Sequence, residues 1–565
     1  MKNYFQNIKL FIKSPLIFIT CLLLNSMIFT KLLQVFHYTA AGAYTYHDYS
    51  VYFISCYLAV YYFIILLMTS FLFFRKTQSA KIGEIVYAIH RTRLERSQFA
   101  VLLTFHGCFS LVIYVVNLAA FWTGGYRDYV PYLVHISIGI AVNYLLDGIL
   151  AIMIGRCLTY LPGLTYQLAG GLLVSCMVSC SEWVYRKTLS DIFYYLFEPF
   201  AVLPQGCGFV FNLYLGNPVQ LHRMGLILFW LGILMIICAY MGKKKTILGA
   251  AITIVSICML LLPYEGLMPI GSYLGRQQWD NRHYVNEKAM EQAEEEIAEF
   301  QVTEYDLNFS VLTCLKAKAV LSLSGEAQEE YCFTLYHPYK VRKVLDQEQK
   351  KLKFTQKGDY ITVRNPDGSK ITEMTFFYSG NGKQFYSQSQ GIYLNYGVAF
   401  YPIAGFHALF REEPVEFAGE MININCMPDV FPEGKPYFKV RIHTGQQVYS
   451  SLPETERNYF EGRAEGFCLL SGFVASRTVG DVTFIYPVLR GVQDTDLPTF
   501  EDAVDYADLL EQEYGNTDFT IHNKKVLIMP ANGSQKCEVI AKDDYVILYE
   551  SIWQSDVEQL YGESK

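Results

Sequence analysis

Long apolar stretches are confined to the first half of the sequence, and they restrict the fold more than any other feature. Stretches of about 17–25 apolar residues are long enough to cross the hydrocarbon core of a bilayer as helices. Seven occur, at residues 14–36, 51–74, 98–121, 130–154, 163–184, 225–241 and 247–263. We therefore predict an α-helical polytopic membrane domain over residues 1–263.

The distribution of charge supports the same division. Residues 1–270 carry 18 Lys and Arg against 9 Asp and Glu, whereas residues 271–565 carry 28 against 44, so the net charges are +9 and −16. The first part has too few charges to cover a soluble protein, and the second has too many to lie in a bilayer. A single soluble enzyme is excluded, and the overall net charge of −7 argues against nucleic acid as a partner.

Positive residues between the apolar stretches predict the orientation of the chain. Lysines precede the first stretch, six Lys and Arg separate the second from the third, Arg156 follows the fourth, and Lys243–Lys245 separate the sixth from the seventh. Cytoplasmic loops are enriched in Lys and Arg, and all these segments lie on the side of the N-terminus. We predict a multi-pass protein of a bacterial cell membrane, with a cytoplasmic N-terminus and an extracytoplasmic C-terminal domain.

The loop between the second and third spans contains a basic amphipathic segment. Its apolar residues recur at i, i+3, i+4 and i+7, so they share one face of a helix. The apolar positions are Ile82, Ile85, Val86 and Ile89, and the charged positions elsewhere on the wheel are Glu84, Arg91 and Arg93. Such a helix either lies on the anionic surface of the lipid bilayer or docks against a partner protein.

Asp147 is the charged residue placed deepest within a predicted span. An intramembrane carboxylate is costly and usually faces the interior of the bundle or a water-filled cavity. Alternatively, Asp147 lies near the cytoplasmic end of its span, where it caps the helix or pairs with Arg156. The residues alone leave both interpretations open.

This layout resembles the permease subunits of ABC-type exporters. The resemblance covers residues 1–245 and rests on about six spans, a cytoplasmic N-terminal helix, the phrase "AKIGEIVYAIHRTRLERSQFAVLL" after the second span, and apolar segments of less than span length within residues 185–224. It implies that the amphipathic segment couples to a separate ATPase subunit and that the chain forms a homo- or heterodimer in the membrane. The seventh span is an addition that carries the remaining chain outside.

After residue 300 the hydrophobic pattern changes to alternating apolar and polar residues, which indicates strands with one buried face. In "LKAKAVLSLSG" one face consists of Leu315, Ala317, Ala319, Leu321 and Leu323. Further strand patterns follow, separated by turn sequences such as Gly358-Asp359 and Pro366-Asp367-Gly368. We predict an acidic helical linker over residues 264–300, a mostly antiparallel β-sandwich or saddle over 301–498, and a small α/β segment over 499–565.

The order of these strand sequences resembles the N-terminal β-domain of zinc aminopeptidases of the aminopeptidase N type. The phrases "YDLNFSVLTCLKAKAVLSLSG", "FKVRIHTGQQVYSSLPE" and "GFCLLSGFVAS" carry the resemblance, and "YGNTDFTIHNKKVLIMP" resembles the entry into the catalytic domain. In that family two His at i and i+4 bind zinc, and a Glu between them activates water. No His in this sequence is followed by Glu, so the HExxH motif is absent.

The sequence also lacks G-x-x-x-x-G-K-[ST], the phosphate-binding loop of ATPases. We therefore expect the chain not to be an enzyme, to have no catalytic or metal-binding residues and to need no cofactor. The leading hypothesis is a permease subunit of an ABC-type exporter whose outer domain binds a peptide substrate or a partner protein. Two alternatives stay open: a membrane-anchored subunit of a metallopeptidase whose zinc site another chain supplies, and a sensor or scaffold that transports nothing.

Overall fold

The computed structural model consists of two compact units, one helical and one rich in sheet. The helical unit comprises Met1–Phe211 and Gly216–Leu262, and the other comprises Asn212–Leu215 and Pro263–Lys565. The structure describes residues 2–40, 57–79, 83–123, 130–187, 200, 202–203, 221–242, 246–261, 297–382, 385–395, 397–414, 422–426, 434–488, 523–529 and 540–549. Most of the predicted linker and most of the predicted α/β segment over residues 499–565 lie outside these ranges.

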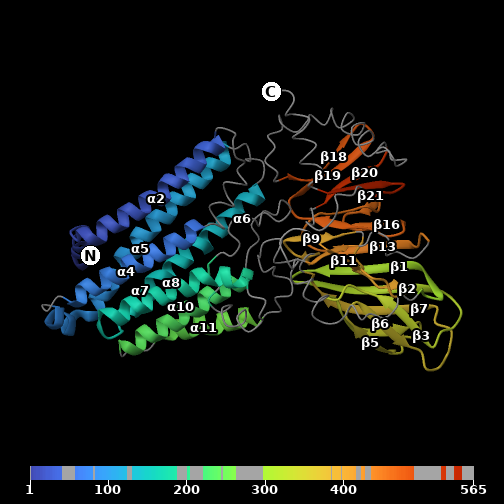
Figure 1. The fold of residues 1–565 in the computed structure, drawn as a ribbon, viewed down its shortest axis with the longest axis horizontal. Coiled ribbons are helices and arrows are strands. Elements are labelled where there is room, and N and C mark those ends of the chain that lie inside the picture. The colour runs from blue at the N-terminus through green and yellow to red at the C-terminus, as the bar shows by residue number, and fades with distance from the viewer. Residues whose placement is uncertain are drawn as a thin grey trace. The chain divides into compact units, whose positions relative to one another are not determined.

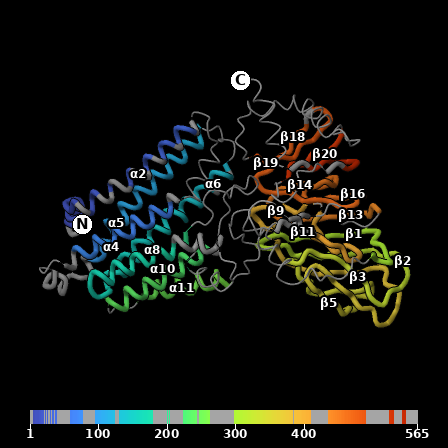
Figure 2. Tube along the Cα trace, viewed as in Figure 1, coloured from blue at the N-terminus to red at the C-terminus, as the bar shows by residue number. Residues whose placement is uncertain are grey.

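The described elements of the first unit are helices. They are α1 (Lys2–Ile12), α2 (Pro15–Ala40), α4 (Tyr57–Ser79), α5 (Gly83–Thr123), α6 (Val130–Ile140), α7 (Asp147–Leu158), α8 (Gly163–Lys187), α10 (Leu221–Met241) and α11 (Ile247–Leu260). A π-helix, η1 (Ala141–Leu146), connects α6 to α7 without a break. Figure 1 shows these helices from blue to green, and Figure 2 traces their Cα path in the same colours.

Four described helical segments are long and apolar enough to cross a membrane. They are Ala59–Lys76, Glu95–Thr123, Tyr132–Leu158 and Arg223–Met241. Two shorter apolar helical segments are Gly163–Val178 and Ile247–Leu260. Helices overlap all seven predicted ranges, but the count of seven spans and the resulting topology stay predictions. The structure supports the coarser statement that several apolar helices of this half are compatible with membrane association.

Helices α10 and α11 form a hairpin in which the two backbones approach closely, and Figure 1 shows them side by side in green. A Cβ atom at Gly232 would lie 2.9 Å from the Thr253 nitrogen and 3.0 Å from the Gly249 carbonyl oxygen. Thr246 caps α11 by accepting a hydrogen bond from the Gly249 N–H at 3.1 Å. Small residues that let backbones approach are typical of helix packing in membranes.

The largest sheet of the second unit has seven strands in the order β15-β16-β13-β1-β2-β7-β4. Their bounds are β1 (Phe300–Val311), β2 (Leu315–Gly325), β4 (Lys340–Asp346), β7 (Glu373–Gly380), β13 (Tyr437–His443), β15 (Glu454–Glu456) and β16 (Tyr459–Arg463). All neighbours in this sheet are antiparallel except β1 and β13, which pair in parallel from Glu304 opposite Tyr437 to Ser310 opposite His443.

The other described strands form four smaller sheets. The order β10-β3-β6-β5 comprises β3 (Glu330–Thr334), β5 (Lys353–Lys357), β6 (Tyr360–Arg364) and β10 (Ile403–Ala404). The order β14-β17-β9-β8 comprises β8 (Ser387–Gln388), β9 (Gly391–Leu394), β14 (Val448–Ser450) and β17 (Leu469–Ser471). A mixed sheet has the order β18-β19-β20-β22-β21 and comprises β18 (Val474–Val479), β19 (Val482–Pro487), β20 (Lys525–Met529), β21 (Ile540–Ala541) and β22 (Tyr545–Tyr549). The fourth sheet has two strands, in which β11 (Phe410–Pro414) pairs with β12 (Ile422–Cys426).

The predicted alternation in "LKAKAVLSLSG" is confirmed by β2. Leu315, Ala317, Ala319, Leu321 and Leu323 are buried. The intervening Lys316 and Lys318 are exposed. The turn predicted at Gly358 is also confirmed: it connects β5 to β6 with φ = 55°, a left-handed conformation that glycine adopts without steric cost. Local patterns therefore predicted this strand and this turn correctly.

Aromatic rings fill the core of the second unit beside β1 and β13. Tyr305 stacks on Phe438 with ring centroids 5.0 Å apart, and Tyr401 stacks on Phe467 with centroids 5.2 Å apart. Phe438 and Phe467 meet edge to face at 5.0 Å. Burial raises the pKa of the Tyr305 phenol above its usual value, because a buried phenolate would lose its hydration.

We expect the sheet-rich unit to lose stability as the pH rises above about 10. Tyr305, Tyr339 and Tyr378 have a raised pKa in the fold because they are buried, so their phenols ionise first in the unfolded chain. Unfolding then releases protons, and the free energy of unfolding falls as pH rises through this range. The measurement is hydrogen exchange in β1 and β13 of the full-length protein on both sides of this pH.

Tyr305→Phe should make this decline with pH shallower, because it removes one of the three ionising groups. Tyr437→Phe is the matched control, since the Tyr437 ring is only half-buried on β13. Equal pH dependence in the native protein and the Tyr305→Phe variant would contradict the assignment.

Candidate functional site

Asp147 is the first residue of α7, and it is buried, with 1% of its surface exposed. Its Oδ2 lies 3.7 Å from Nη1 of Arg223, a buried residue near the start of α10. The predicted alternative, a pair with Arg156, is wrong. Asp147 and Arg156 are nine positions apart, so they lie on opposite sides of the helix and about 13 Å apart along its axis.

The hydrogen bonds around this ion pair are incomplete among the described residues. Arg223 donates from Nη1 to the Val202 carbonyl oxygen at 3.4 Å and from Nη2 to Oδ1 of Asn143. Neither carboxylate oxygen of Asp147, nor Nε of Arg223, has a hydrogen-bond partner in the described part of the chain. Buried charges normally have complete hydrogen bonding because their desolvation is costly. An incompletely bonded pair is a site that can hold water, a proton or a small ion.

The π-helix η1 contacts a further polar group, His106. Nε2 of His106, on α5, lies 3.0 Å from the Leu145 carbonyl oxygen, and the Tyr62 hydroxyl on α4 lies 2.6 Å from Nδ1. Because a carbonyl only accepts, Nε2 carries the proton, and Nδ1 of the neutral ring accepts from Tyr62. A Cβ atom at Gly148 would lie 2.8 Å from Nδ1 of His106 and closer still to its neighbouring carbon, so glycine makes room for the ring. Single turns of π-helix often occur at functional sites.

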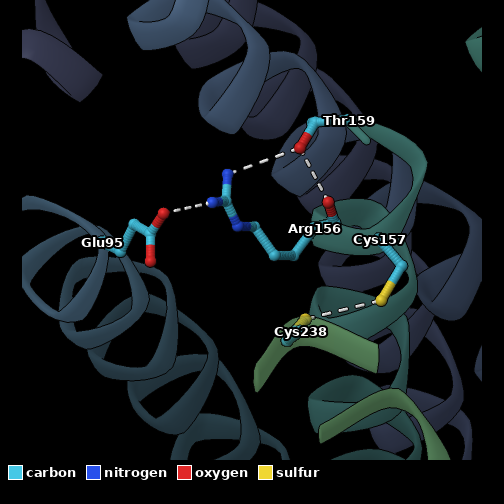
Figure 3. A network of polar contacts seen from close by, with 5 residues as sticks. All are labelled: Glu95, Arg156, Cys157, Thr159 and Cys238. Atoms are coloured by element: carbon cyan, nitrogen blue, oxygen red, sulfur yellow. Dashed lines mark hydrogen bonds and ion pairs between the residues drawn. The ribbon is translucent and has the colours of Figure 1, made fainter. Parts of the chain in front are cut away.

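Arg156 joins α7 to α5 near the C-terminal end of α7, as Figure 3 shows. Its Nη2 donates to Oε1 of Glu95 at 2.6 Å, and its Nη1 donates to Oγ1 of Thr159 at 3.4 Å. The guanidinium also lies over the rings of Phe74 and Tyr160, at 5.3 and 4.9 Å from their centroids. A short charged hydrogen bond that is buried on the arginine side is a strong contact between two helices.

The predicted ATPase-contacting segment forms the first turns of α5. Glu84, Ile85, Val86, Ile89, Arg91 and Arg93 lie within this helix, whereas Ile82 precedes the described residues of α5. The structure does not describe the side chains before Glu95 in this segment, so their predicted role stays a prediction. What it describes is the helical backbone, which continues without interruption into the apolar segment Glu95–Thr123.

A cavity of about 610 Å³ lies within the second unit beside the start of β1. Residues that line it include the aromatic Tyr305, Tyr401 and Phe438 and the charged Lys435, Arg463 and Glu465. Lys435 forms an ion pair with Asp543, and Glu465 forms one with Lys542 at 2.7 Å. The three aromatic rings are almost fully buried, so the exposed part of the lining includes the paired charges and not the rings. Within the described residues, no group of three or more His, Cys, Asp and Glu is arranged to hold a metal ion.

Sequence reasoning found Asp147 but missed Arg223 and His106. The predicted span 225–241 begins two residues after Arg223 and so leaves it outside the span, whereas α10 begins at Leu221. His106 lies inside the predicted span 98–121. The rule that singled out Asp147, that a polar residue within an apolar span is usually functional, would have found it.

No protein-family model matches the chain, and no curated protein matches it. Among solved structures it is similar to a variant of the M1 zinc metallopeptidase from Deinococcus radiodurans, with 14% identity, a TM-score of 0.30, and coverage of 45% of this chain and 61% of that chain. Native yeast LTA4 hydrolase has 13% identity, a TM-score of 0.29, and coverage of 45% and 41%. The same yeast hydrolase in complex with bestatin has 14% identity, a TM-score of 0.31, and coverage of 46% and 42%.

This likeness to M1 aminopeptidase and LTA4 hydrolase structures is weak, and the chain spans about 41–61% of the length of these proteins. It identifies no activity or substrate for this chain, and it lends no support to the resemblance with exporter permeases.

The comparison contradicts the expectation that the chain is not an enzyme, because the similar structures are enzymes. The expectation rested on the absence of HExxH and of a phosphate-binding loop. Those absences exclude a zinc site and a nucleotide site built on these two motifs. They do not exclude catalysis by other residues, so the expectation went further than the motifs allow.

Proposed function

We propose that the chain is an integral membrane subunit of an ABC-type exporter that works with a separate ATPase. The observation that carries the proposal is the length of α5. Its 41 residues extend over about 60 Å, whereas the hydrocarbon core of a bilayer is about 30 Å thick. The helix is therefore long enough to span a membrane and to project from it with the basic segment that precedes Glu95.

A continuous helix supports coupling because a push on its projecting end moves the whole element. Glu95 lies at the junction between the basic segment and the apolar segment of α5, and its contact with Arg156 would transmit that movement to α7. Helix α1 packs against the same region of α5. Asn7 donates to Oγ of Ser97, and the Tyr4 hydroxyl donates to Oγ1 of Thr104 at 3.0 Å.

In the proposed exporter, the second unit binds a peptide. On the predicted topology it lies outside the cell, where its cavity of about 610 Å³ is of the size that small ligands and side chains occupy. The lining includes the exposed Ile297 and the charged Lys435, Arg463 and Glu465. It suits a peptide, because an apolar side chain contacts Ile297 and polar groups meet the charges. The peptide would be either the exported substrate or part of a partner protein.

Ile85→Asp should reduce recovery of the ATPase with this protein by about tenfold or more, the effect of 1.4 kcal/mol or more of lost binding free energy. The reason is that a carboxylate replaces an apolar side chain of the predicted docking face. The measurement is the amount of ATPase that copurifies with the tagged full-length protein from membranes of its own cells.

Tyr87→Asp is the matched control, because position 87 lies on the opposite side of the helical wheel and the change adds the same charge. The proposal fails if the native protein recovers no ATPase, or if the two variants recover equal amounts. Recovery of a chain with an HExxH motif in place of an ATPase would favour the metallopeptidase alternative.

A further inference from the structure

Two thiols from different helices lie next to each other, as Figure 3 shows. Sγ of Cys157 lies 3.5 Å from Sγ of Cys238. Cys157 is in the last turn of α7, which ends at Leu158, and Cys238 is in the last turn of α10, which ends at Met241. Both side chains are partly exposed and lie in the last turns of their helices, so the pair is not enclosed in the core of the bundle.

The separation of the sulfurs is short enough for a bond to form with little movement. A disulfide has an S–S distance of about 2.05 Å, so the two sulfurs need to approach by about 1.5 Å. Side-chain rotation supplies such a shift, because each thiol is attached through a single rotatable bond. Cys157 also lies 3.9 Å from the Leu234 carbonyl oxygen, a weak contact that holds its sulfur on the side of α10.

We propose that Cys157 and Cys238 are a site of reversible oxidation, at which a disulfide joins α7 to α10. The oxidant is a small-molecule disulfide. The thiolate of one cysteine attacks it, forms a mixed disulfide and releases one small thiol. The second cysteine then attacks the mixed disulfide, the Cys157–Cys238 bond forms, and the other small thiol leaves. The protein loses two electrons and two protons, and the oxidant gains both as its two halves become thiols.

The bond would act on the buried ion pair, because the same two helices carry Asp147 and Arg223. In the reduced state no covalent bond joins α10 to α7 at this end. In the oxidised state the helix ends are joined covalently, which holds the distance between the two charged groups. On the predicted topology this end faces the cytoplasm, a reducing compartment where disulfides are usually transient and redox-sensing.

The test counts free thiols in the full-length protein within its own membranes. The membranes are treated with diamide, which takes up the same two electrons and two protons from a dithiol as it becomes a hydrazine. The protein is then denatured, and its cysteines are alkylated with a maleimide polymer that shifts its mobility. We expect two fewer modified cysteines after diamide than after a reducing agent. Cys157→Ser and Cys238→Ser should each abolish this difference, whereas Cys176→Ser, which removes an exposed thiol of α8, should preserve it.

An unchanged thiol count after diamide would overturn the proposal and leave the pair as a packing contact. Persistence of the difference in either serine variant would assign the disulfide to other cysteines, and a diamide-induced dimer would assign it to an intermolecular bond. Hydrogen exchange of α7 and α10 in the reduced variants shows whether they keep the native fold. The outcome is independent of ATPase recovery, so this proposal and the proposed function succeed or fail separately.

Discussion

Asp147→Leu should destabilise the helical bundle by about 3–5 kcal/mol, the usual effect of leaving one member of a buried ion pair without its partner. The variant leaves the guanidinium of Arg223 buried with two neutral acceptors, the Asn143 side chain and the Val202 carbonyl. Arginine cannot lose its charge in a protein. Resistance of the full-length protein to unfolding by denaturing detergent measures the effect.

Arg223→Met should destabilise the bundle less than Asp147→Leu does. It leaves a buried carboxylate, but a carboxyl group can take up a proton and become neutral, whereas a guanidinium cannot lose one. A larger loss of stability in Asp147→Leu than in Arg223→Met therefore indicates an effect of the unpaired charge. Lost packing would not explain it, since methionine is close to arginine in length.

The double variant Asp147→Leu with Arg223→Met completes the cycle. Apolar groups of similar volume commonly replace a buried ion pair with no loss, or with a gain of about 1–4 kcal/mol. We expect the double variant to recover stability but to lose any function that needs a charge or a water at this site. If the two single effects add without coupling, the 3.7 Å contact is not an ion pair that stabilises the fold.

The alternation of apolar and polar residues predicted individual strands, but it did not predict which strands pair. The alternation over residues 315–325 specifies β2 because the period of two applies within one strand. The parallel pairing of β1 with β13 was not predictable in this way. Parallel neighbours need a long crossover, so the sequence next to β1 contains no information about its partner.

The same limit applies to the candidate site. Asp147 was found because one charge within an apolar span is visible in the sequence. Its partner depends on how α10 packs against α7, and the predicted span begins four residues after the start of α10, which leaves Arg223 in a loop. The contact between Cys157 and Cys238 depends on the same packing, and neither cysteine lies in a motif that could have drawn attention to it.

Gly155→Ala should destabilise the contact between α4 and α7 by about 1–3 kcal/mol, the usual effect of overpacking. A Cβ atom at this position would lie 2.8 Å from the Leu67 carbonyl oxygen, 2.9 Å from the Phe71 nitrogen and closer still to Oγ of Ser70. The serine side chain can rotate away, but the first two atoms belong to the backbone of α4. The helices must therefore separate, and the neighbouring Arg156 would move away from Glu95.

Gly107→Ala on α5 is the matched control, because no heavy atom outside its own turn lies within 4 Å of a Cβ atom there. Alanine favours a helix by up to about 1 kcal/mol over glycine, so this variant should be neutral or more stable. Adding Ser70→Ala to Gly155→Ala should recover only part of the loss, because the backbone contacts remain. If Gly155→Ala and Gly107→Ala resist detergent unfolding equally, α4 and α7 are not in close backbone contact at Gly155. Close packing of α4 against α7 would then not be what holds Arg156 in contact with Glu95.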